Sequence, residues 1–416
     1  MSDSRVVITG LGVVTPIGIG LPEFWPNLLA GTNGVSRLTA FDVSAFPSTM
    51  AAEVRGFDPG RWIDPKSAAR MDRFSQFAVA AADLAMADSG LASRPFDGER
   101  AGVIIGSGIG GSETIESGHA RLAGKGVRGL DPFLVSKLLV NMAACMVSIR
   151  FGLKGPLSAP SVACSTGANA IGDAFRILAR GDADIMLAGG SEACLTPMAY
   201  GGFCANRSMS RRNDRIDTAS RPFDKGRDGF VMGEGAGVAV LERLEHARGR
   251  GARIYAEMAG YGNTADAFHF TAPDPEAGGM IRAMRRALDD AGLPPEAIGH
   301  INAHGTSTVL NDKLESAAIR AVFGPRAGMI KVSAIKSMIG HLLAAAGAVE
   351  FAAAVLSVHE GIVPPTINYQ QPDPDCPLDY VTRGPETIEL RAALSNSFGF
   401  GGGNVCLAVK RFENQP

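Results

Sequence analysis

Asp88-Ser-Gly-Leu91 and Asp290-Ala-Gly-Leu293 are two copies of one short motif, and their surroundings decide the fold of this 416-residue chain. Each copy ends a segment with apolar residues at helical spacing, and a short apolar strand that runs into a glycine-bearing loop follows it. The glycine suits the C-terminal cap of a helix. Because the copies lie roughly two hundred residues apart, they indicate a duplicated domain rather than a solenoid of short repeats.

The segments around the two motifs repeat one order of elements. We predict strand, helix and strand at residues 5–14, 74–87 and 101–105, and again at 254–262, 280–290 and 298–303. Mixed strands and helices in this order favour stacked α/β layers. No Pro-rich, Gly-rich or charged linker interrupts the chain, so we expect two closely joined halves, 1–252 and 253–416.

Composition narrows the class of protein. Hydrophobic residues make up 46% of the chain and charged residues 20%, as in a globular protein with a large core. A formal net charge of -2 argues against a nucleic-acid binder, although it permits a local basic patch. The N-terminus, MSDSRVVITG, lacks the basic and apolar regions of a signal peptide. The apolar stretch 342–358 is rich in Ala and contains Glu350, so we expect a buried core helix and no membrane span.

The cysteines show no CxxC pairing and no secretory context, so we expect reduced thiols in the cytoplasm. Five of them lie in apolar or loop settings and are interpreted as core residues: Cys145, Cys194, Cys204, Cys376 and Cys406. The sixth, Cys164, stands in a different context.

Cys164 lies where a strand is expected to turn into a helix. The motif Val162-Ala-Cys-Ser-Thr-Gly167 is followed by apolar residues at helical spacing that end at a capping Gly181. Unpaired N–H groups and the helix dipole at such a place favour a negative charge, so we expect a lowered thiol pKa. Small neighbours would let a thioester approach the sulfur. By this context alone, Cys164 is either a nucleophile or a small buried core residue.

Two histidines of the second half stand in polar clusters. His304 ends a predicted strand within the run 302–308, Asn-Ala-His-Gly-Thr-Ser-Thr, and His341 begins a predicted helix after Lys336-Ser-Met-Ile-Gly340. We expect the helix N-terminus to lower the pKa of His341, because a neutral ring that donates an N–H can stabilise an enolate or oxyanion. Lys336 is either a salt-bridge partner of Glu350 or a cation that orders the histidines, or both.

The remaining histidines receive no role. They are interpreted as surface or turn residues, among them His119, His246, His300 and His359. The spacing from His304 to His341 contains no short ligand pair, so we predict no zinc site.

Two glycine-rich loops need separate interpretations. The loop 396–404, Asn-Ser-Phe-Gly-Phe-Gly-Gly-Gly-Asn, either presents an N–H to an oxyanion and moves an aromatic gate, or is a tight turn between strands. Gly106-Ser-Gly-Ile-Gly-Gly111 fits a dinucleotide-binding fingerprint. The residues 112–119 are too polar for the packed helix that this fingerprint requires, and another βα unit precedes it, so we reject an oxidoreductase.

Taken together, the motifs closely resemble the β-ketoacyl-[acyl-carrier-protein] synthases of the second type, which elongate chains in dissociated fatty-acid synthesis. The resemblance runs from Val6 to about Arg411. It rests on the motifs at 162–167, 302–308, 336–341 and 396–402, joined by Ser220-Arg-Pro-Phe-Asp224 and by the run 228–236, Asp-Gly-Phe-Val-Met-Gly-Glu-Gly-Ala.

This resemblance implies a fold, a mechanism and a set of residues. The fold is thiolase-like, with two pseudo-symmetric halves in five layers, α-β-α-β-α. The mechanism is ping-pong and needs no cofactor: a cysteine takes the acyl chain, and a malonyl thioester then loses carbon dioxide and attacks it. The implied catalytic residues are Cys164, His304, His341, Lys336 and Phe400, and the implied substrate-binding residues are Thr306, Thr308, Phe398 and Ile109.

Each implied residue has a stated task. The two histidines would hold the malonyl thioester oxygen, and Lys336 would order them together with Glu350. The N–H groups of Cys164 and Phe400 would form the oxyanion hole, and the Phe400 ring would gate the pocket. The two threonines would hydrogen-bond the pantetheine arm.

The resemblance also implies a homodimer and an acidic, phosphopantetheinylated acyl carrier protein as partner. A basic docking patch is then required despite the nearly neutral total charge. The candidate residues form two clusters, Lys66 with Arg70, and Arg207 with Arg211 and Arg212. Such runs of charge can equally be an ordinary solvated face.

Two departures and three alternatives stay open. Gly403 stands where the family commonly has Thr, and the loop 131–137 lacks a second proline often found there. A ketosynthase of polyketide or specialised acyl-chain synthesis would share every motif. A degradative thiolase would need a second catalytic cysteine in a Cys-x-Gly context, whereas Cys406 is followed by Leu-Ala. A non-catalytic chain-length subunit would lack the nucleophile.

Overall fold

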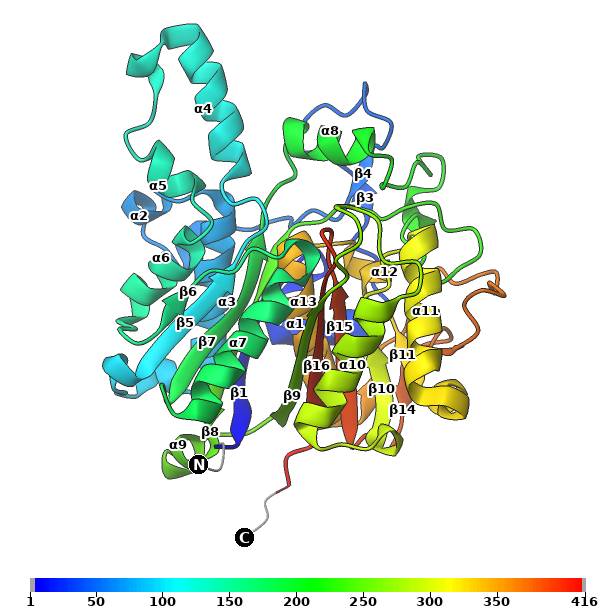
Figure 1. Ribbon diagram of the computed structural model, residues 1–416. Helices are drawn as coiled ribbons and strands as arrows, with labels where there is room; N and C mark the ends of the chain where they lie inside the picture. Colours follow the sequence, from blue (N-terminus) through cyan, green and yellow to red (C-terminus); the bar gives the residue numbers. More distant parts are fainter. Residues whose placement is uncertain (1–3, 414–416) are drawn as a thin grey trace.

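Strands from both halves of the chain share one mixed 12-stranded sheet in the computed structural model, which describes residues 4–413 (Figure 1). The strands are β1 (Val6–Thr15), β2 (Gly18–Ile19), β5 (Ala101–Gly106), β6 (Leu157–Ser158), β7 (Ile185–Glu192), β8 (Gly235–Arg243), β9 (Ala256–Ala265), β10 (Ile298–Asn302), β11 (Lys331–Ser333), β13 (Asp379–Tyr380), β15 (Ala392–Phe398) and β16 (Gly403–Lys410). Their order is β13-β11-β10-β15-β16-β9-β1-β8-β7-β5-β6, with β2 beside β1. The halves meet where residues 6–8 pair antiparallel with residues 256–258.

Helices and two small pairs of strands complete the fold. The helices are α1 (Leu21–Leu29), α2 (Pro65–Ala68), α3 (Arg73–Asp88), α4 (Ser112–Lys125), α5 (Leu134–Leu138), α6 (Met142–Phe151), α7 (Thr166–Arg180), α8 (Pro197–Ala205), α9 (Leu244–Gly249), α10 (Gly278–Ala291), α11 (Val309–Phe323), α12 (Lys336–Ile339) and α13 (Ala346–Glu360). Two small pairs of strands lie apart, β3 (Ser36–Arg37) with β4 (Met50–Ala51), and β12 (Ile362–Val363) with β14 (Glu386–Thr387).

The internal duplication predicted from the sequence is confirmed. The first half runs β1-α3-β5-β6-α7-β7-β8, and the second half repeats this order as β9-α10-β10-β11-α13-β15-β16. The glycine of each repeated motif, Gly90 and Gly292, adopts a left-handed conformation with φ of 74° and 59°. A residue with a Cβ is strained in that conformation, which explains why a glycine stands at the end of both helices.

The elements stack in the five layers that the resemblance implies. The helices α3 and α6 cover the outer face of the first set of strands, α7 and α13 lie between the two sets, and α10 and α11 cover the other outer face (Figure 1). The predicted core helix at 342–358 is confirmed, because every residue of α13 up to Val358 is buried. Strands flank α7 and α13 on both sides, and this position requires small residues.

One segment, Leu343–Glu360, is long and apolar enough to cross a membrane by length and composition, and 89% of it is buried inside the protein. Burial of this extent is typical of the core helix of a folded domain, as its position between the strands also indicates.

The prediction that residues 112–119 do not form a packed helix is confirmed. They begin the helix α4, of which only Ser112 and Gly118 are buried, so it projects from the body as Figure 1 shows instead of packing on the sheet. The prediction that His300 lies on the surface or in a turn is wrong. His300 is fully buried in β10, because its ring faces the core between strands and finds the Ser333 hydroxyl at 2.9 Å.

Candidate active site

Cys164 lies in a tight turn that leads directly into α7. Ala163–Ser165 form a single 3₁₀ turn, and Ala163 has a φ of 47°, which is strained for a residue with a Cβ. Thr166 stabilises the turn, because its hydroxyl donates to the Ala163 carbonyl at 2.7 Å and accepts from the Val162 N–H at 2.8 Å. The predicted position of the cysteine at a helix start is confirmed.

The duplicated half builds the same turn at the start of α13. Leu343–Ala345 form a 3₁₀ turn, and Leu343 has a φ of 50°. His341 precedes this turn, and its Nδ1 accepts a hydrogen bond from the Leu343 N–H at 3.2 Å. The two turns contact each other, so the duplication itself brings Cys164 and His341 together.

His304 arrives from the end of β10, which lies two strands further along the sheet from β16. Its backbone N–H donates to Glu315 at 2.8 Å, and the Lys336 ammonium donates to its carbonyl at 2.7 Å. Lys336 also lies 3.3 Å from His304 Nδ1 and forms a buried ion pair with Glu350. The predicted partnership of Lys336 with Glu350 is confirmed, and it orders the histidine directly.

The two imidazole rings face each other across the site. Their centroids lie 5.4 Å apart at an interplanar angle of 84°. In each ring Nδ1 is engaged, by Lys336 in His304 and by the Leu343 N–H in His341. A neutral ring whose Nδ1 accepts carries its proton on Nε2. Both histidines therefore present an Nε2–H donor.

Burial holds both histidines in the neutral form. It lowers the pKa of His304 and of His341 well below the ordinary range, and the nearby Lys336 cation lowers both further. The direction expected for His341 is confirmed, but the expected cause is wrong. Desolvation by burial and the Lys336 charge lower the pKa, and the helix α13 begins only at Ala346, five residues beyond His341.

The expected lowering of the Cys164 pKa is wrong. Burial raises the pKa of this thiol to about 11, although the Lys336 charge and the N–H groups of Phe400 and Cys164 oppose the rise. The free energy lost when a thiolate is removed from water exceeds the stabilisation that a helix N-terminus provides. At neutral pH the free protein therefore holds a thiol, with donors already placed for the thiolate.

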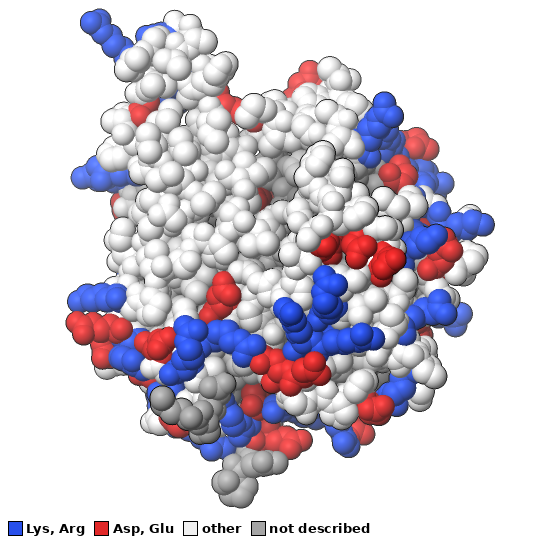
Figure 2. All heavy atoms as spheres, viewed as in Figure 1, with Lys and Arg blue, Asp and Glu red and all other residues white. Residues whose placement is uncertain are grey.

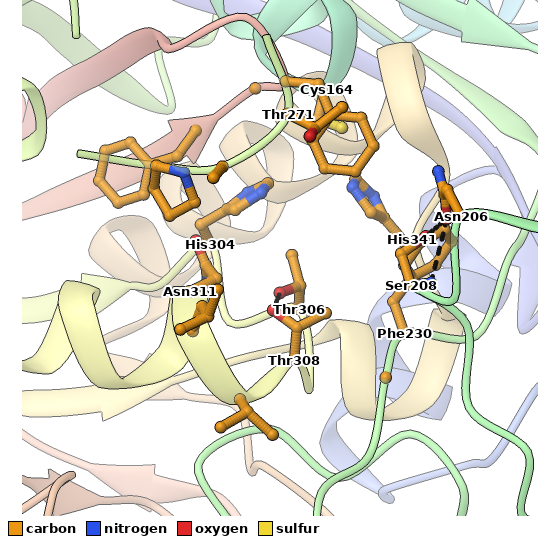
Figure 3. A pocket seen from close by; sticks show the side chains of 18 of the residues that line it. Cys164, Asn206, Ser208, Phe230, Thr271, His304, Thr306, Thr308, Asn311 and His341 are labelled. Atoms are coloured by element: carbon orange, nitrogen blue, oxygen red, sulfur yellow. Dashed lines mark hydrogen bonds between the residues drawn. The ribbon is translucent and has the colours of Figure 1, made fainter. Parts of the chain in front are cut away.

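A cavity of about 380 Å³ joins these groups. Cys164, His304 and His341 all line it, with both rings directed toward the sulfur end (Figure 3). Thr306 and Thr308 line its wall and hydrogen-bond each other at 2.8 Å. The cavity thus collects the cysteine, histidine and threonine motifs, which are spread over 144 residues of sequence between Cys164 and Thr308 and extend further to His341.

The two phenylalanines of the glycine-rich loop also line the cavity. The Phe398 ring lies against His304, with centroids 5.7 Å apart. Phe400 is 38% exposed and lies 6.4 Å from the Phe203 ring, and its N–H reaches the Cys164 sulfur. Ile109 lies outside the cavity and packs in the apolar cluster that contains Cys164.

The candidate docking residues are placed unevenly. Arg207 lines the cavity, and Arg211 is exposed nearby on the same loop. Arg212 is half-buried and donates to the Gly226 carbonyl at 2.7 Å, so it supports the loop. Lys66 and Arg70 are exposed around α2, away from the cavity lining, and the Arg70 guanidinium lies over the Phe133 ring at 4.8 Å.

Sequence reasoning missed two buried carboxylates that support the site. Glu315 accepts the N–H groups of His304 and Gly305, both at 2.8 Å, and burial raises its pKa to about 7. Glu192 lies at the end of β7 and is completely buried. A glutamate on an amphipathic helix or at a strand end is normally predicted to face solvent. No signal in the sequence therefore distinguished Glu315 and Glu192 from surface residues.

Between residues 4 and 413, no group of three or more His, Cys, Asp or Glu side chains could hold a metal ion. All six cysteines are free. The site is therefore built from a thiol, two neutral imidazoles, a lysine and backbone donors.

Comparison with known proteins agrees with this arrangement. Residues 3–247 match the N-terminal domain of beta-ketoacyl synthase, and residues 255–370 match its C-terminal domain. A 3-oxoacyl-[acyl-carrier-protein] synthase 2 of Coxiella burnetii is 50% identical, and one of Synechocystis is 48% identical; each alignment covers 99% of both chains.

Solved structures show the same fold at lower identity. A beta-ketoacyl synthase from Burkholderia phymatum is 39% identical with a TM-score of 0.92, and the match covers 99% of this chain and 100% of the other. A ketosynthase solved in complex with its type II polyketide acyl-carrier protein is 38% identical with a TM-score of 0.91, at the same coverage. Two domain models and full-length relatives near half identity lead to one conclusion: this chain belongs to the β-ketoacyl synthase family.

Proposed function

We propose that the protein catalyses the decarboxylative Claisen condensation of an acyl thioester with malonyl-[acyl-carrier-protein], which yields 3-oxoacyl-[acyl-carrier-protein] in type II fatty-acid synthesis. The observation that carries this proposal is the shared cavity, in which one thiol faces two neutral Nε2–H donors. The names of the relatives at 48–50% identity support the fatty-acid pathway, since the polyketide ketosynthase is only 38% identical.

In the first half-reaction, Cys164 takes the acyl group. Its sulfur attacks the thioester carbonyl, the bond between that carbonyl and the carrier's sulfur breaks, and the thiol proton leaves with the carrier's sulfur. The N–H groups of Cys164 and Phe400 hold the developing oxyanion, and their reach to the sulfur supports this assignment. The Lys336 charge and these N–H groups already lower the pKa of the thiol, which burial still holds at about 11, so binding of the acyl thioester must assist formation of the thiolate.

In the second half-reaction, the malonyl thioester enters the emptied cavity. The Nε2–H groups of His304 and His341 donate to its thioester oxygen, the carboxylate leaves as carbon dioxide, and the electron pair forms an enolate. The enolate carbon attacks the acyl-enzyme carbonyl, the C–S bond to Cys164 breaks, and the thiolate takes a proton from solvent. Neutral imidazoles suit this step, because they stabilise charge without losing a proton.

The test is a two-step incubation of the purified protein. Acyl carrier proteins loaded with chains of several lengths should acylate Cys164, seen as the corresponding mass increase of the protein. Addition of malonyl-carrier protein should then release carbon dioxide and a 3-oxoacyl product with two more carbons. Acylation at another residue, or acylation without any condensation, would contradict the proposal.

An acyl carrier protein is the expected partner, as the complex of the related polyketide ketosynthase supports. The carrier must stand over the cavity mouth for its arm to reach Cys164. Arg207 and Arg211 are exposed on the loop beside the mouth, and Lys66 with Arg70 offer a second basic cluster. We propose that these four attract the acidic carrier, while Arg212 fixes the loop.

We also propose a homodimer formed over the side that carries α4, α5, α6 and β6. β6 ends the sheet, and Leu157 on it is exposed, as are Val135 and Ile149 on the neighbouring helices. Figure 2 shows a broad area with few charges between the projecting α4 and the charged band at the lower end. Exposed apolar side chains beside an open sheet edge favour pairing with a second copy.

We also propose a division into two halves and a cytoplasmic location. The division at 252/253 falls between α9 and β9, and it separates the two sets of repeated elements. A cytoplasmic location is supported by six free cysteines, of which five are buried.

A further inference from the structure

Glu192 lies beneath the active site as a buried carboxylate with an unusual number of backbone donors. It is 0% exposed at the C-terminal end of β7. Its Oε1 accepts from the Ser107 hydroxyl at 2.8 Å and the Ile109 N–H at 3.3 Å, and its Oε2 accepts from the Gly108 N–H at 2.9 Å. These donors form the glycine-rich fingerprint loop, so its N–H groups hold a protein carboxylate.

The carboxylate also reaches the turn that follows His341. The Ala344 N–H donates to it, from the 3₁₀ turn Leu343–Ala345. This turn packs directly against the strand that bears Glu192. The contact leaves no room for a side chain, since a Cβ on Gly190 would lie 2.3 Å from the Ala344 carbonyl oxygen. Glu192 therefore bridges the loop of Ile109 in the first half and the turn of His341 in the second.

The strained backbone at Leu343 requires contacts that keep it in this conformation. A φ of 50° is costly for leucine, and strain of this kind persists only where neighbours enforce it. In that conformation the Leu343 N–H points to His341 Nδ1 at 3.2 Å and leaves the ring proton on Nε2. The next N–H along the chain, that of Ala344, is the one that Glu192 binds.

We propose that Glu192 is a positioning residue that fixes the tautomer of His341 by holding the strained Leu343–Ala345 turn, and that ties this turn to the loop of Ile109. This inference rests on the proposed function for its kinetic consequence only. The carboxylate touches neither substrate nor the reacting atoms. It acts through the chain Glu192, Ala344 N–H, Leu343 N–H, His341.

The test uses Glu192→Gln, which keeps the shape but places an NH₂ group against N–H donors. The matched control is Glu242→Gln, because Glu242 is equally buried at 0% exposure and lies on the neighbouring strand β8 opposite Ile185, at the other end of β7 from Glu192. Nitrogen NMR of ¹⁵N-histidine-labelled protein reports the tautomer of each ring, and the spectrum of His341→Ala assigns the His341 signals. Malonyl-carrier protein decarboxylation is measured alongside.

In the parent protein, His341 should show Nδ1 without a proton and Nε2 with one. In Glu192→Gln these signals should move toward a mixture of tautomers, and decarboxylation should fall at least about tenfold, because displacement of a donor by an ångström is that costly. The Glu242→Gln variant should keep the His341 signals. Ser107→Ala removes one donor that steers the carboxylate, and it should move the same signals less far.

Unchanged His341 signals in both Glu192→Gln and Ser107→Ala would overturn the inference. A decarboxylation rate for Glu192→Gln within twofold of Glu242→Gln would also overturn it. Failure of the proposed function is distinguishable, since it would show as a parent protein that neither acylates nor condenses, whereas the tautomer is read without any substrate.

Discussion

Burial decides the proton affinity of each reacting side chain at the residue scale. The thiol of Cys164 has its pKa raised to about 11, while those of the rings of His304 and His341 are driven down. All three groups are thus uncharged at neutral pH, and the Lys336–Glu350 pair supplies the charge beside them. Substrate binding, not the resting protein, must create the thiolate.

Replacing Cys164 with Ala should abolish acyl-enzyme formation and condensation while the protein stays folded, because the side chain loses only its sulfur. Mass spectrometry and circular dichroism check these outcomes.

In the unmodified protein, iodoacetamide should alkylate Cys164 slowly at pH 8, and the rate should keep rising toward pH 11 as thiolate forms. A rate that levels off near pH 7 would contradict the raised pKa.

His304→Ala and His341→Ala should each reduce malonyl decarboxylation by about a hundredfold and acylation of Cys164 much less. Each variant removes one Nε2–H donor to the enolate oxygen, a loss of the size known for oxyanion donors. Carbon dioxide release and acyl-enzyme mass, measured separately, distinguish the steps. An equal fall in both half-reactions would count against the assigned roles.

His300 predicts how stability depends on pH. Burial lowers its pKa to about 3 from the ordinary 6.5, so below pH 6.5 the unfolded chain binds a proton that the folded chain rejects. The free energy of unfolding should therefore fall by a few kcal/mol between pH 6.5 and pH 3 on account of this one ring. Thermal melts of His300→Phe should show a smaller fall of Tm over this pH range. His119→Phe, a change at an exposed residue, should leave the pH dependence of Tm as in the parent protein.

At the element scale, the two central helices begin in matching strained turns. Each 3₁₀ turn opens with a non-glycine residue at positive φ, Ala163 and Leu343, and each passes into a helix of 15 residues. Their close approach depends on glycines, since a Cβ on Gly167 would lie 2.8 Å from the Ala344 carbonyl oxygen. The duplication thus places a nucleophile and a donor at equivalent helix starts.

Gly190→Ala should destabilise the protein by about 2 kcal/mol or more and reduce condensation, because its Cβ would collide with the Ala344 carbonyl at 2.3 Å and displace the turn. Gly202→Ala in α8 is the control. Its Cβ would meet nothing within 4 Å, so stability should stay equal or rise slightly. Denaturant titration measures both, and equal stability of the two variants would contradict the packing argument.

At the scale of the whole molecule, several exposed apolar residues lie on the side of α4, α5 and α6, among them Val135 and Ile149. Figure 2 shows charged side chains gathered in a band at the lower end and along the right-hand edge, with few in the area below the projecting α4. The sheet also ends on this side, at the two-residue strand β6. A second copy could continue the sheet there and cover Val135 and Ile149.

Light scattering of the purified protein should therefore give about twice the 43.2 kDa chain mass. Leu157→Asp and Val135→Asp should each shift the protein toward monomer, because an aspartate would be buried without a partner in the interface. Val309→Asp, at an apolar residue that is also exposed but lies beside the cavity mouth, should leave the mass unchanged. A monomer in the parent protein would exclude the homodimer.

The sequence by itself determined the duplicated α/β fold and identified the cysteine, the two histidines and the two threonines that line the cavity. Periodicity and the paired Asp-x-Gly-Leu motifs were enough for the strands and helices, because their apolar faces and left-handed glycines are local properties. The motifs around Cys164, His304 and His341 named the chemistry. Only the tertiary structure decided the proton affinities, because desolvation depends on neighbours from distant segments.

The same reason explains the errors. The thiol and helix start of Cys164 are visible in the sequence, but the burial that raises its pKa is not. His300 and Glu192 read as solvated polar residues, and both are buried, because the strands that enclose them come from elsewhere in the chain. A local pattern fixes which face a residue occupies, and only the packed layers determine whether that face meets water.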